Sequence, residues 1–438
     1  MTSDRSTIFA VASGAGRAGV MVIRISGPDA GSALQALTWR ALPAPRMATL
    51  ADLCDPEGNL LDKALVLWFP APASFTGEDV VELHCHGGRA VLLAVTAALG
   101  RLPGLRLAEP GEFSRRAFAN GKLDLTGAEA IADLVEAETD LQRRQALRQM
   151  EGGLGRLYER WRAALLEAQA LVEAAIDFPD EDLPEGLIEG ARTQAVGIVR
   201  EILDHLEDNR AGQVIRDGVR MAILGEPNAG KSSIFNALVQ RDAAIVTPIP
   251  GTTRDVLEAR IDLGGYQVLL ADTAGLRDTA DIVEQEGVRR ARQAGEAADL
   301  LLLVADATRQ PYLPPEFAPL LQGRGLLVWN KTDLAPAPSG GIAVSAATGA
   351  GLDELRSRVC QILEALYPLG DGANLTRERH RSALEECCGH LDRFLTAAEA
   401  ELGAEDLRLA VRSLGRITGR VDVEDMLDVL FGSFCIGK

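Results

Sequence analysis

A glycine-rich loop between an apolar strand and a helical pattern carries the strongest chemical signal in the sequence. In MAILGEPNAGKSS, Gly225 and four further residues precede Gly230, Lys231 and Ser232. Such glycines let backbone N–H groups turn inward around phosphate oxygens, and a helix N-terminus adds partial positive charge. The spacing predicts a P-loop in which Lys231 reaches the terminal phosphates and Ser232 ligates magnesium. The predicted nucleotide contacts of this loop are Asn228, Ala229, Gly230, Lys231, Ser232 and Ser233.

Two further strand ends carry polar residues that suit the same ligand. VLLADTAG ends a buried strand with Asp272, which can hold the magnesium shell, and Gly275, whose N–H can meet a γ-phosphate. LLVWNKTD ends another strand with Asn330, Lys331 and Asp333. Each motif in isolation also fits an ordinary strand-to-loop turn, but their order in one chain predicts a nucleotide site. The predicted contacts added here are Asp272, Thr273, Ala274, Gly275, Asn330, Lys331, Asp333, Ser345, Ala346 and Ala347.

The last motif predicts which base is bound. Asp333 can accept hydrogen bonds from the ring N–H and the exocyclic amine of guanine, whereas adenine would leave the carboxylate unpaired. Lys331 would cover the plane of the base. The loop VSAATG, residues 344–349, would present a backbone N–H to the guanine carbonyl. We therefore expect a GTP-binding domain.

The residue that activates water for GTP hydrolysis is less clear from the sequence. Leu276 occupies the position at which Ras-like enzymes carry a water-orienting glutamine. Hydrolysis is then either slow or assisted by another group, for which Glu284 is the nearest candidate; a solvated acid at a helix end is the alternative for that residue.

The segment VTPIPGTTRD, residues 246–255, fits a first switch, with Thr253 closing on magnesium and the γ-phosphate. It has no obvious arginine finger. A monovalent cation held by Asn228, the loop from Thr247 to Thr252 and the phosphates is a hypothesis for the missing positive charge.

Composition and length indicate how many domains the chain forms and how its charge is distributed. A chain of 438 residues with 47% hydrophobic and 25% charged residues is expected to form two or three folded domains rather than a disordered chain. Its net charge of −18 lies entirely beyond residue 120, since residues 1–120 hold 11 basic and 11 acidic side chains. An acidic surface repels phosphate backbones, so RNA would need a local basic patch or a second protein to present it.

Cysteine usage and the N-terminal sequence indicate the compartment. The six cysteines contain no C-x-x-C pair, which favours reduced thiols over disulfides or zinc. No signal peptide or long apolar segment is apparent, so we expect a cytoplasmic protein.

Changes of pattern along the chain suggest its domains. Alternating apolar runs with Gly and Pro predict an α+β domain over residues 1–120, and three- and four-residue apolar spacing predicts long amphipathic helices over 125–150, 154–176 and roughly 187–210. A βα alternation from Val219 ends near the linker 368–374, after which helical spacing resumes. The expected fold is multidomain, α/β plus α: an α+β domain at 1–120, a helical domain at 121–216 and 368–438, and a Ras-like P-loop domain inserted at 217–367.

Several longer segments resemble the MnmE (TrmE) family of tRNA-modification GTPases. They are RISGP (24–28), HGG (86–88), EPGEFSRRAFANGKLDLTGAEAIADL (109–134), GEPNAGKSS, PGTTRD, DTAGLR and the terminal CIGK. The resemblance runs nearly end to end, and the central block and tail are more specific than the nucleotide motifs, which many GTPases share.

The resemblance implies a homodimer with an N-terminal tetrahydrofolate-binding and dimerisation domain, a helical domain, and an inserted G domain that dimerises in a potassium-dependent way. It implies a heterotetramer with a FAD-containing partner, MnmG, which presents much of the tRNA. Together they would add an aminomethyl or carboxymethylaminomethyl group to the wobble uridine of certain tRNAs. The one-carbon donor would be formyl- or methylene-tetrahydrofolate, and GTP hydrolysis would drive the conformational cycle.

The resemblance also assigns site residues by position. Its folate contacts fall on Arg24, Glu82, Lys122 and Lys438. Its potassium ligands fall on Asn228, Thr247, Ile249 and Thr252, and its magnesium ligands on Ser232 and Thr253. Its catalytic glutamate falls on Glu284, the candidate reached above from the residues.

Three weaker possibilities remain open at this point. Cys435 would lie near the folate pocket and either take part in the chemistry or pack as an inert thiol. His84 and His86 share one face of a predicted strand, but no third metal ligand is evident, so packing or pocket lining is favoured. A ribosome-assembly or RNA-binding switch GTPase is the alternative function; such proteins pair these motifs with a basic RNA-binding module, and we see no basic cluster outside the P-loop region.

Overall fold

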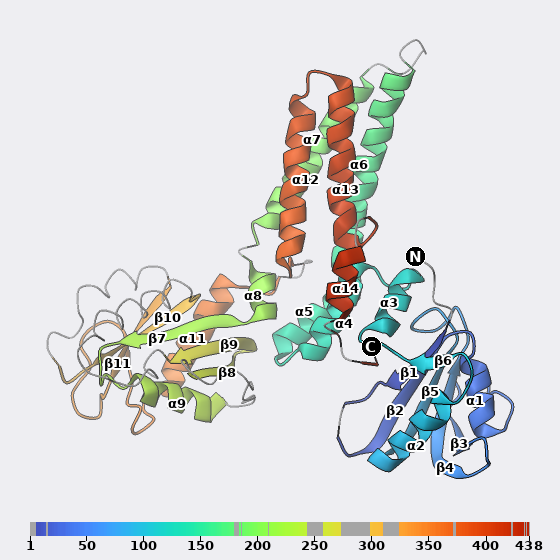
Figure 1. Cartoon of the computed structure of the whole chain (residues 1–438). Coiled ribbons are helices and arrows are strands. Elements are labelled where there is room, and N and C mark those ends of the chain that lie inside the picture. Colours follow the sequence, from blue (N-terminus) through green and yellow to red (C-terminus); the bar gives the residue numbers. More distant parts are fainter. Residues whose placement is uncertain are drawn as a thin grey trace, which may run out of the picture. The chain divides into compact units, whose positions relative to one another are not determined.

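The computed structural model describes most of the chain (Figure 1). The residues outside the description are 1–5, 15, 179–183, 185, 209, 243–256, 273–297, 310–323, 371–373, 422, 423, 433, 435 and 438. The chain divides into two compact units. The first contains Met1–Ala132 and Arg412–Lys438, and the second contains Asp133–Val411.

A six-stranded sheet forms the larger part of the first unit, in the order β3-β4-β5-β2-β1-β6. Its neighbours are antiparallel except for β1 and β6. The strands are β1 (Thr7–Val11), β2 (Ala18–Ser26), β3 (Thr49–Cys54), β4 (Leu60–Phe69), β5 (Val80–Gly87) and β6 (Leu105–Leu107). Helices α1 (Ala30–Thr38) and α2 (Arg89–Gly100) cover one face. Because side chains alternate along each strand, Arg24 and Glu82 lie on the opposite face.

The rest of the first unit is helical. It comprises α3 (Glu112–Ala119), the start of α4 (Leu125–Glu136), the end of α13 (Ala400–Thr418) and α14 (Glu424–Gly432). Leu125 of α4 packs with Phe431 and Phe434 in a small apolar cluster. An isolated bridge joins Pro110 to Ile436, so the last residues of the chain return to the N-terminal sequence.

The second unit has a helical part, formed by helices before and after its sheet in the sequence. They are α5 (Asp140–Met150), α6 (Gly153–Asp177), α7 (Leu187–Leu206), α8 (Ala211–Asp217), α12 (Glu378–Thr396) and α13. Helix α7 packs against α6 and α12, and α12 contacts α13 through the Arg393–Asp406 pair (Figure 1). The buried residues of α6 recur at three- and four-residue spacing, as the amphipathic pattern predicted.

The expected helical segment 125–150 forms two helices, α4 and α5, rather than one. A capping box at Thr139 begins the second helix. The Thr139 hydroxyl accepts a hydrogen bond from the Gln142 backbone N–H at 3.4 Å, and the Gln142 side chain accepts one from the Thr139 N–H at 3.1 Å. The apolar spacing continues across this break, which is why periodicity alone did not reveal it.

A second six-stranded sheet follows, in the order β12-β11-β10-β7-β9-β8. All neighbours are parallel except β8 and β9. The strands are β7 (Val219–Gly225), β8 (Leu257–Leu263), β9 (Tyr266–Asp272), β10 (Leu300–Asp306), β11 (Gly325–Asn330) and β12 (Ile342–Ala343), and the described helices are α9 (Lys231–Asp242) and α11 (Leu352–Leu366). The carboxyl ends of parallel strands meet at one sheet edge, where α/β folds bind ligands.

An α+β N-terminal part, a helical part and a Ras-like α/β part are therefore present, as the sequence predicted at this coarse level. Within the described ranges, none of the helices combines the length and the apolar character needed to span a bilayer.

Candidate functional site

The loop between β7 and α9 is shaped by two glycines with positive φ. Gly225 has φ 146° and Gly230 has φ 93°. A Cβ on Gly225 would lie 2.0 Å from the carbonyl oxygen of Val304, and one on Gly230 would lie 2.1 Å from the side-chain nitrogen of Asn330. Any side chain at either position would force the loop away from β10 or β11, so glycine is required for this close approach.

Lys231 begins α9 and folds back across the loop. Its ammonium donates to the carbonyls of Gly225 at 2.9 Å and Glu226 at 2.8 Å. Ser232 and Ser233 follow on the exposed first turn of the helix. A cationic side chain, the N–H groups of a helix N-terminus and a hydroxyl therefore gather at one loop, which is a suitable set for a polyphosphate with its metal ion.

Asn330, at the end of β11, joins this loop to two others. The residue is 2% exposed. Its side-chain nitrogen donates to the Ala229 carbonyl at 2.9 Å, and its side-chain oxygen accepts from the Ala346 N–H at 3.1 Å. Three of the predicted nucleotide contacts, from three separate sequence motifs, are thus in direct hydrogen-bonded contact.

The carboxylate of Asp333 is oriented by a buried serine. Ser345, which is 1% exposed, donates from Oγ to Asp333 Oδ1 at 2.6 Å. The same hydroxyl accepts from the Thr348 N–H at 3.2 Å, which fixes the loop that also carries Ala347. Asp333 itself is exposed, so its second oxygen is available to a ligand on the solvent side.

A second group of predicted residues lies on the open face of the first sheet. Arg24 on β2 and Glu82 on β5 are direct cross-strand partners. The guanidinium donates to Glu82 Oε1 from Nε at 3.1 Å and from Nη2 at 2.9 Å. The Arg24 guanidinium carbon also lies 5.3 Å from the centre of the Phe75 ring and 5.8 Å from that of Phe113. The charge pair therefore lies beside two aromatic rings, and its side chains are 22% and 21% exposed.

Lys122 contacts the loop between β4 and β5, which also carries Phe75. Its ammonium donates to the Pro72 carbonyl at 3.1 Å, and its stem packs on Gly77. The loop therefore contacts Lys122 through Pro72 and Arg24 through Phe75. The C-terminal tail lies against the end of β1, since a Cβ on Gly437 would lie 2.0 Å from the carbonyl oxygen of Val11.

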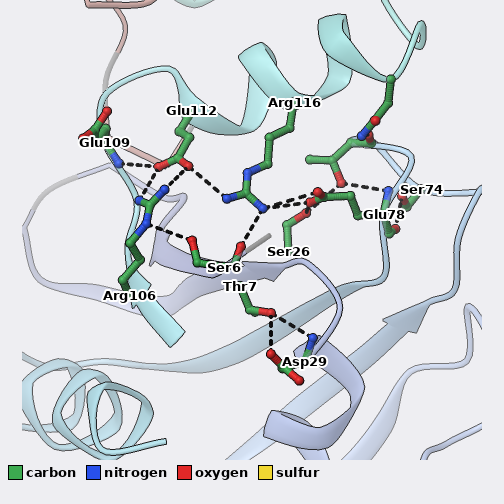
Figure 2. Close-up of polar contacts among 12 residues, drawn as sticks. Ser6, Thr7, Ser26, Asp29, Ser74, Glu78, Arg106, Glu109, Glu112 and Arg116 are labelled. Carbon is green, nitrogen blue, oxygen red and sulfur yellow. Dashed lines mark hydrogen bonds and ion pairs between the residues drawn. The ribbon is translucent and has the colours of Figure 1, made fainter. Parts of the chain in front are cut away.

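Hydrogen bonds and ion pairs hold the loop between β4 and β5 against α3, as Figure 2 shows. Arg116 of α3 donates to Glu78 at 3.2 Å and to the Ser6 carbonyl at 2.9 Å. Glu112 accepts from Arg106 at 2.7 Å and from Arg116 at 3.0 Å. Burial raises the pKa of Glu112, but the hydrogen bonds from Arg106, the Glu109 N–H and Arg116 together lower that pKa below its usual value. The carboxylate is thus ionised and the loop is tied to α3.

His84 and His86 have separate partners. His84 Nε2 lies 3.5 Å from Glu82, and His86 Nδ1 lies 2.7 Å from Asp62. Burial, with a smaller contribution from Asp62, raises the pKa of the Cys85 thiol between them to about 12, so this thiol stays protonated. In the part of the chain that the structure covers, no group of three His, Cys, Asp or Glu residues has the arrangement of a metal site.

Comparison with curated proteins finds relatives over the full length. The tRNA modification GTPase MnmE of Paramagnetospirillum magneticum is 56% identical over 439 aligned residues, covering 99% of this chain and 99% of that protein. The chain belongs to the MnmE family. The MnmE protein of Parvibaculum lavamentivorans is also 56% identical, over 99% of this chain and 100% of its own length.

Two family models divide the MnmE sequence. The model described as GTP-binding protein TrmE N-terminus matches residues 7–122, and the MnmE helical domain model matches residues 125–435. Among solved structures, the G domain of the T. maritima FeoB iron transporter is similar at 27% sequence identity, with a TM-score of 0.25; the match covers 33% of this chain and 98% of that one.

Asp306 is a residue of this MnmE-family site that sequence reasoning missed. It ends β10 and is 5% exposed, and it is the strand partner of Asn330. Its carboxylate lies 2.6 Å from the ammonium of Lys331, which has φ 63°. Burial raises the pKa of Asp306, but hydrogen bonds from Lys331 and Thr308 outweigh it and lower the pKa to about 2. The available signal was its place at a strand end beside the base-reading motif.

Some predicted MnmE-family site residues lie outside the described part of the chain. They are Thr247, Ile249, Thr252, Thr253, Thr273, Ala274, Gly275, Glu284, Cys435 and Lys438. Asp272 is described only in its backbone, which pairs with Ile223 of β7. Those assignments stay predictions.

Proposed function

We propose that this chain is a potassium-stimulated GTPase that acts with a FAD-containing partner of the MnmG type. Together they add an aminomethyl or carboxymethylaminomethyl group to the wobble uridine of certain tRNAs, with a tetrahydrofolate as one-carbon donor. Membership of the MnmE family supports the tRNA-modification role. The observation that carries the nucleotide role is the junction at Asn330, where the phosphate loop and the base-reading loops are hydrogen-bonded to one buried side chain.

Guanine specificity follows from Asp333. The carboxylate is held by Ser345, so it is oriented before any ligand binds. It accepts hydrogen bonds from the ring N–H and amine of guanine, and adenine cannot supply that pair of donors. Calorimetry should show firm GTP binding and no measurable ATP binding; equal affinities would contradict the assignment.

The residues suit magnesium and potassium by their chemistry. Ser232 is exposed at the start of α9, so its hydroxyl is available to a metal ion at the loop, and the backbone of β9 ends at Asp272, which pairs with Ile223 of β7. We assign magnesium to Ser232 and Thr253, and potassium to Asn228, Thr247, Ile249 and Thr252. When bound, the cations neutralise negative charge on the phosphates. Equal GTPase rates in sodium and potassium would exclude the potassium assignment.

Glu284 is proposed to orient the attacking water, because Leu276 cannot. Cys435 is proposed to act beside the folate. Replacement of Glu284 by glutamine should lower the GTPase rate while leaving GTP affinity nearly unchanged. A parallel fall in affinity would instead assign Glu284 to binding.

The charged and aromatic residues around Arg24 suit a folate. Arg24, Lys122 and Lys438 are cations that can pair with glutamyl carboxylates, and Glu82 can accept from the donor edge of a pterin. The Phe75 ring beside Arg24 offers an apolar surface for an aromatic ligand. A bound tetrahydrofolate would supply the one-carbon unit, and these residues would hold and orient it. Tight folate binding would separate this function from that of a switch GTPase that modifies nothing.

A homodimer through the N-terminal domain is supported by the open sheet face. Leu50 and Leu65 are cross-strand partners on β3 and β4, and they are 64% and 46% exposed. Apolar pairs on the uncovered face of an antiparallel sheet are typical of surfaces that bind another protein. Sedimentation of the L50E/L65E variant should show monomers if this face forms the dimer.

The decisive experiment for the whole proposal is mass spectrometry of wobble-uridine nucleosides. A strain that lacks the corresponding gene would be complemented with this chain. Restored modification would support the proposal, and unmodified uridine in the presence of well-expressed protein would contradict it.

A further inference from the structure

An arginine-rich segment lies in the helical part of this acidic chain. Residues 143–162 contain six basic and two acidic side chains, whereas the whole chain has a net charge of −18. The basic residues are Arg143, Arg144, Arg148, Arg156, Arg160 and Arg162, and the acidic ones are Glu151 and Glu159. The expectation of no basic cluster outside the P-loop region was therefore wrong.

Two of these arginines line a cavity. A hollow of about 240 Å³ opens where α5 ends and α6 begins, against the segment that follows α11. Its polar lining consists of Gln145, Arg148, Gln149, Glu151, Arg156, Asn374 and Thr376. A second hollow of about 690 Å³ shares Gly153, Arg156 and Asn374 with the first and adds Leu157, Arg160, Asp204, His205 and Asp208, so its acidic residues lie on the side away from Arg148. Because the two share part of their walls, they form one groove, which we call the α5–α6 groove.

The partners of these arginines differ. Arg148 donates to the carbonyl of Gly370 and Arg156 to the carbonyl of Glu151. Within the described ranges neither guanidinium pairs with a carboxylate, whereas Arg160 donates to Glu201 at 2.8 Å. A guanidinium held by a neutral carbonyl keeps its full charge and most of its five N–H donors. Arg148 and Arg156 are thus oriented cations along one groove.

The groove wall also contains side-chain amides with unused hydrogen-bonding capacity. Gln145 is 7% exposed, and its nitrogen donates to the Gly212 carbonyl at 2.8 Å. Among the residues that the structure describes, neither the Gln145 side-chain oxygen nor the Asn374 side-chain nitrogen has a hydrogen-bond partner. Leaving a buried polar atom unpaired costs about 1–3 kcal/mol, so such atoms indicate a missing partner. The groove offers one acceptor and one donor beside two cations.

We propose that the α5–α6 groove is an RNA-contacting surface of this chain. Arg148 and Arg156 bind successive phosphates, and the amides of Gln145 and Asn374 bind the polar edge of a base or ribose between them. The inference rests on the proposed function, in which tRNA is the substrate. An acidic protein segment would also pair with the arginines, and its backbone would meet the two amides; RNA is favoured because tRNA is the substrate in the proposed function, and the test separates the two. Arg148 and Arg156 would give a chain of net charge −18 a local contact with a polyanion.

The test measures binding of the full-length protein to a tRNA transcript with uridine at the wobble position, by fluorescence anisotropy over a range of salt concentrations. The R148Q/R156Q variant is expected to bind at least about tenfold more weakly. The slope of log affinity against log salt should fall by about 1.5, because two phosphate contacts are lost. The R148K/R156K variant keeps both charges and should keep the wild-type salt slope.

The matched control is R393Q/R408Q. Like the test variant, it removes two positive charges, but from Arg393 of α12 and Arg408 of α13. These arginines pair with Asp406 and Glu405, and neither lines the groove. It should bind tRNA as the wild type does. Melting temperature and basal GTPase rate, measured on every variant, identify a variant that fails to fold.

Three outcomes would overturn the inference. They are wild-type tRNA affinity in the folded R148Q/R156Q variant, an equal loss in the R393Q/R408Q control, or unchanged tRNA binding with loss of binding to the FAD-containing partner. The last result would assign the groove to a protein. If the wild-type chain binds no tRNA alone or with that partner, and complementation restores no modification, the proposed function itself fails.

Discussion

The side-chain nitrogen of Asn330 donates a hydrogen bond to the Ala229 carbonyl at 2.9 Å, although 101 positions separate the two residues. The base-reading motif and the phosphate loop are therefore one hydrogen-bonded structure rather than two sites that meet only through a ligand. The contact is buried, so breaking it leaves a carbonyl unpaired away from water.

Replacement of Asn330 by aspartate should weaken GTP binding at least about tenfold and destabilise the α/β part by about 1–3 kcal/mol. Aspartate still accepts from the Ala346 N–H, but it cannot donate to Ala229 and brings a negative charge toward that carbonyl. Titration with a fluorescent GTP analogue and urea unfolding would measure both effects. The neighbouring T332V variant is the control, and an equal loss in that variant would show that Asn330 has no special role.

Replacement of Asp333 by asparagine should exchange the base preference. Asparagine donates where aspartate accepts, so it loses the guanine amine and gains the second carbonyl of xanthine. We expect GTP affinity to fall about 100-fold or more and XTP affinity to rise. Competition between the two nucleotides would measure the change. Loss of both affinities to the same extent would mean that Asp333 is structural.

The motifs at strand ends were predictable because their spacing is distinctive, whereas the contacts that hold their loops in place were not. The P-loop follows from the positions of two glycines and a lysine, since few other structures need that combination. Asp306 was missed because one aspartate after a buried strand has no characteristic spacing. Its role depends on the parallel register of β10 and β11, which sets it opposite Asn330 and is decided by tertiary packing.

The same distinction applies to the N-terminal part. The resemblance supplied Arg24, Glu82 and Lys122, but it gave no account of what holds the loop between them. That support comes from Arg116 and Glu78, which are far apart in the sequence and meet only in the folded unit. The break at Thr139 was missed for a different reason. A capping box was present in the sequence, but the helical period on both sides concealed it.

Asp306 should give the protein an acid-sensitive contribution to stability. Its pKa of about 2 lies below the ordinary value of 3.8, so the stabilisation is complete above pH 3.8 and is lost as the pH falls through 2. We expect D306N to be less stable by on the order of 1 kcal/mol at pH 7, a figure discounted because Lys331 is partly solvated. Urea unfolding at several pH values would test this, since the variant's deficit should shrink as the pH falls below 4. A constant deficit would contradict it.

Replacement of Arg116 by methionine should destabilise the N-terminal unit by roughly 3 kcal/mol and weaken folate binding. The side chains of Arg116 and Glu112 are 11% and 10% exposed. Arg106 still pairs with Glu112 in the variant, but Glu78 and the Ser6 carbonyl lose the guanidinium that donates to them. The control is R101M, because Arg101 and Glu57 are 62% and 61% exposed. An exposed pair contributes little, so that variant should change stability by less than about 0.5 kcal/mol. Similar thermal unfolding of the two variants would refute the buried network as a support of the loop.

Asp133 should govern how firmly the α/β part is held to the helices around it. One oxygen of its carboxylate accepts from Arg216 at 2.9 Å and from Arg377 at 2.7 Å. Arg216 lies in α8, just before the chain enters β7, and Arg377 caps α12, after the chain has left α11. One carboxylate, 10% exposed, therefore holds both connectors, by which we mean α8 before β7 and the start of α12 after α11. D133N should increase amide hydrogen exchange in residues 211–217 and 374–380 by at least about tenfold, because it removes the charge that both guanidinium groups share.

The matched control is D217N. Asp217 contacts the same Arg216 at 2.6 Å but is 48% exposed, so its removal should leave exchange in both connectors nearly unchanged. GTP affinity should be nearly the same in both variants, because the contacts described for Asp133 and Asp217 are with Arg216 and Arg377 and not with the phosphate or base-reading loops. Two results would contradict this. Amide hydrogen exchange would be alike in D133N and D217N, or in D133N it would increase only in residues 211–217, the connector that carries Arg216. Either result would mean that each connector is stabilised by its own local packing rather than by one shared residue.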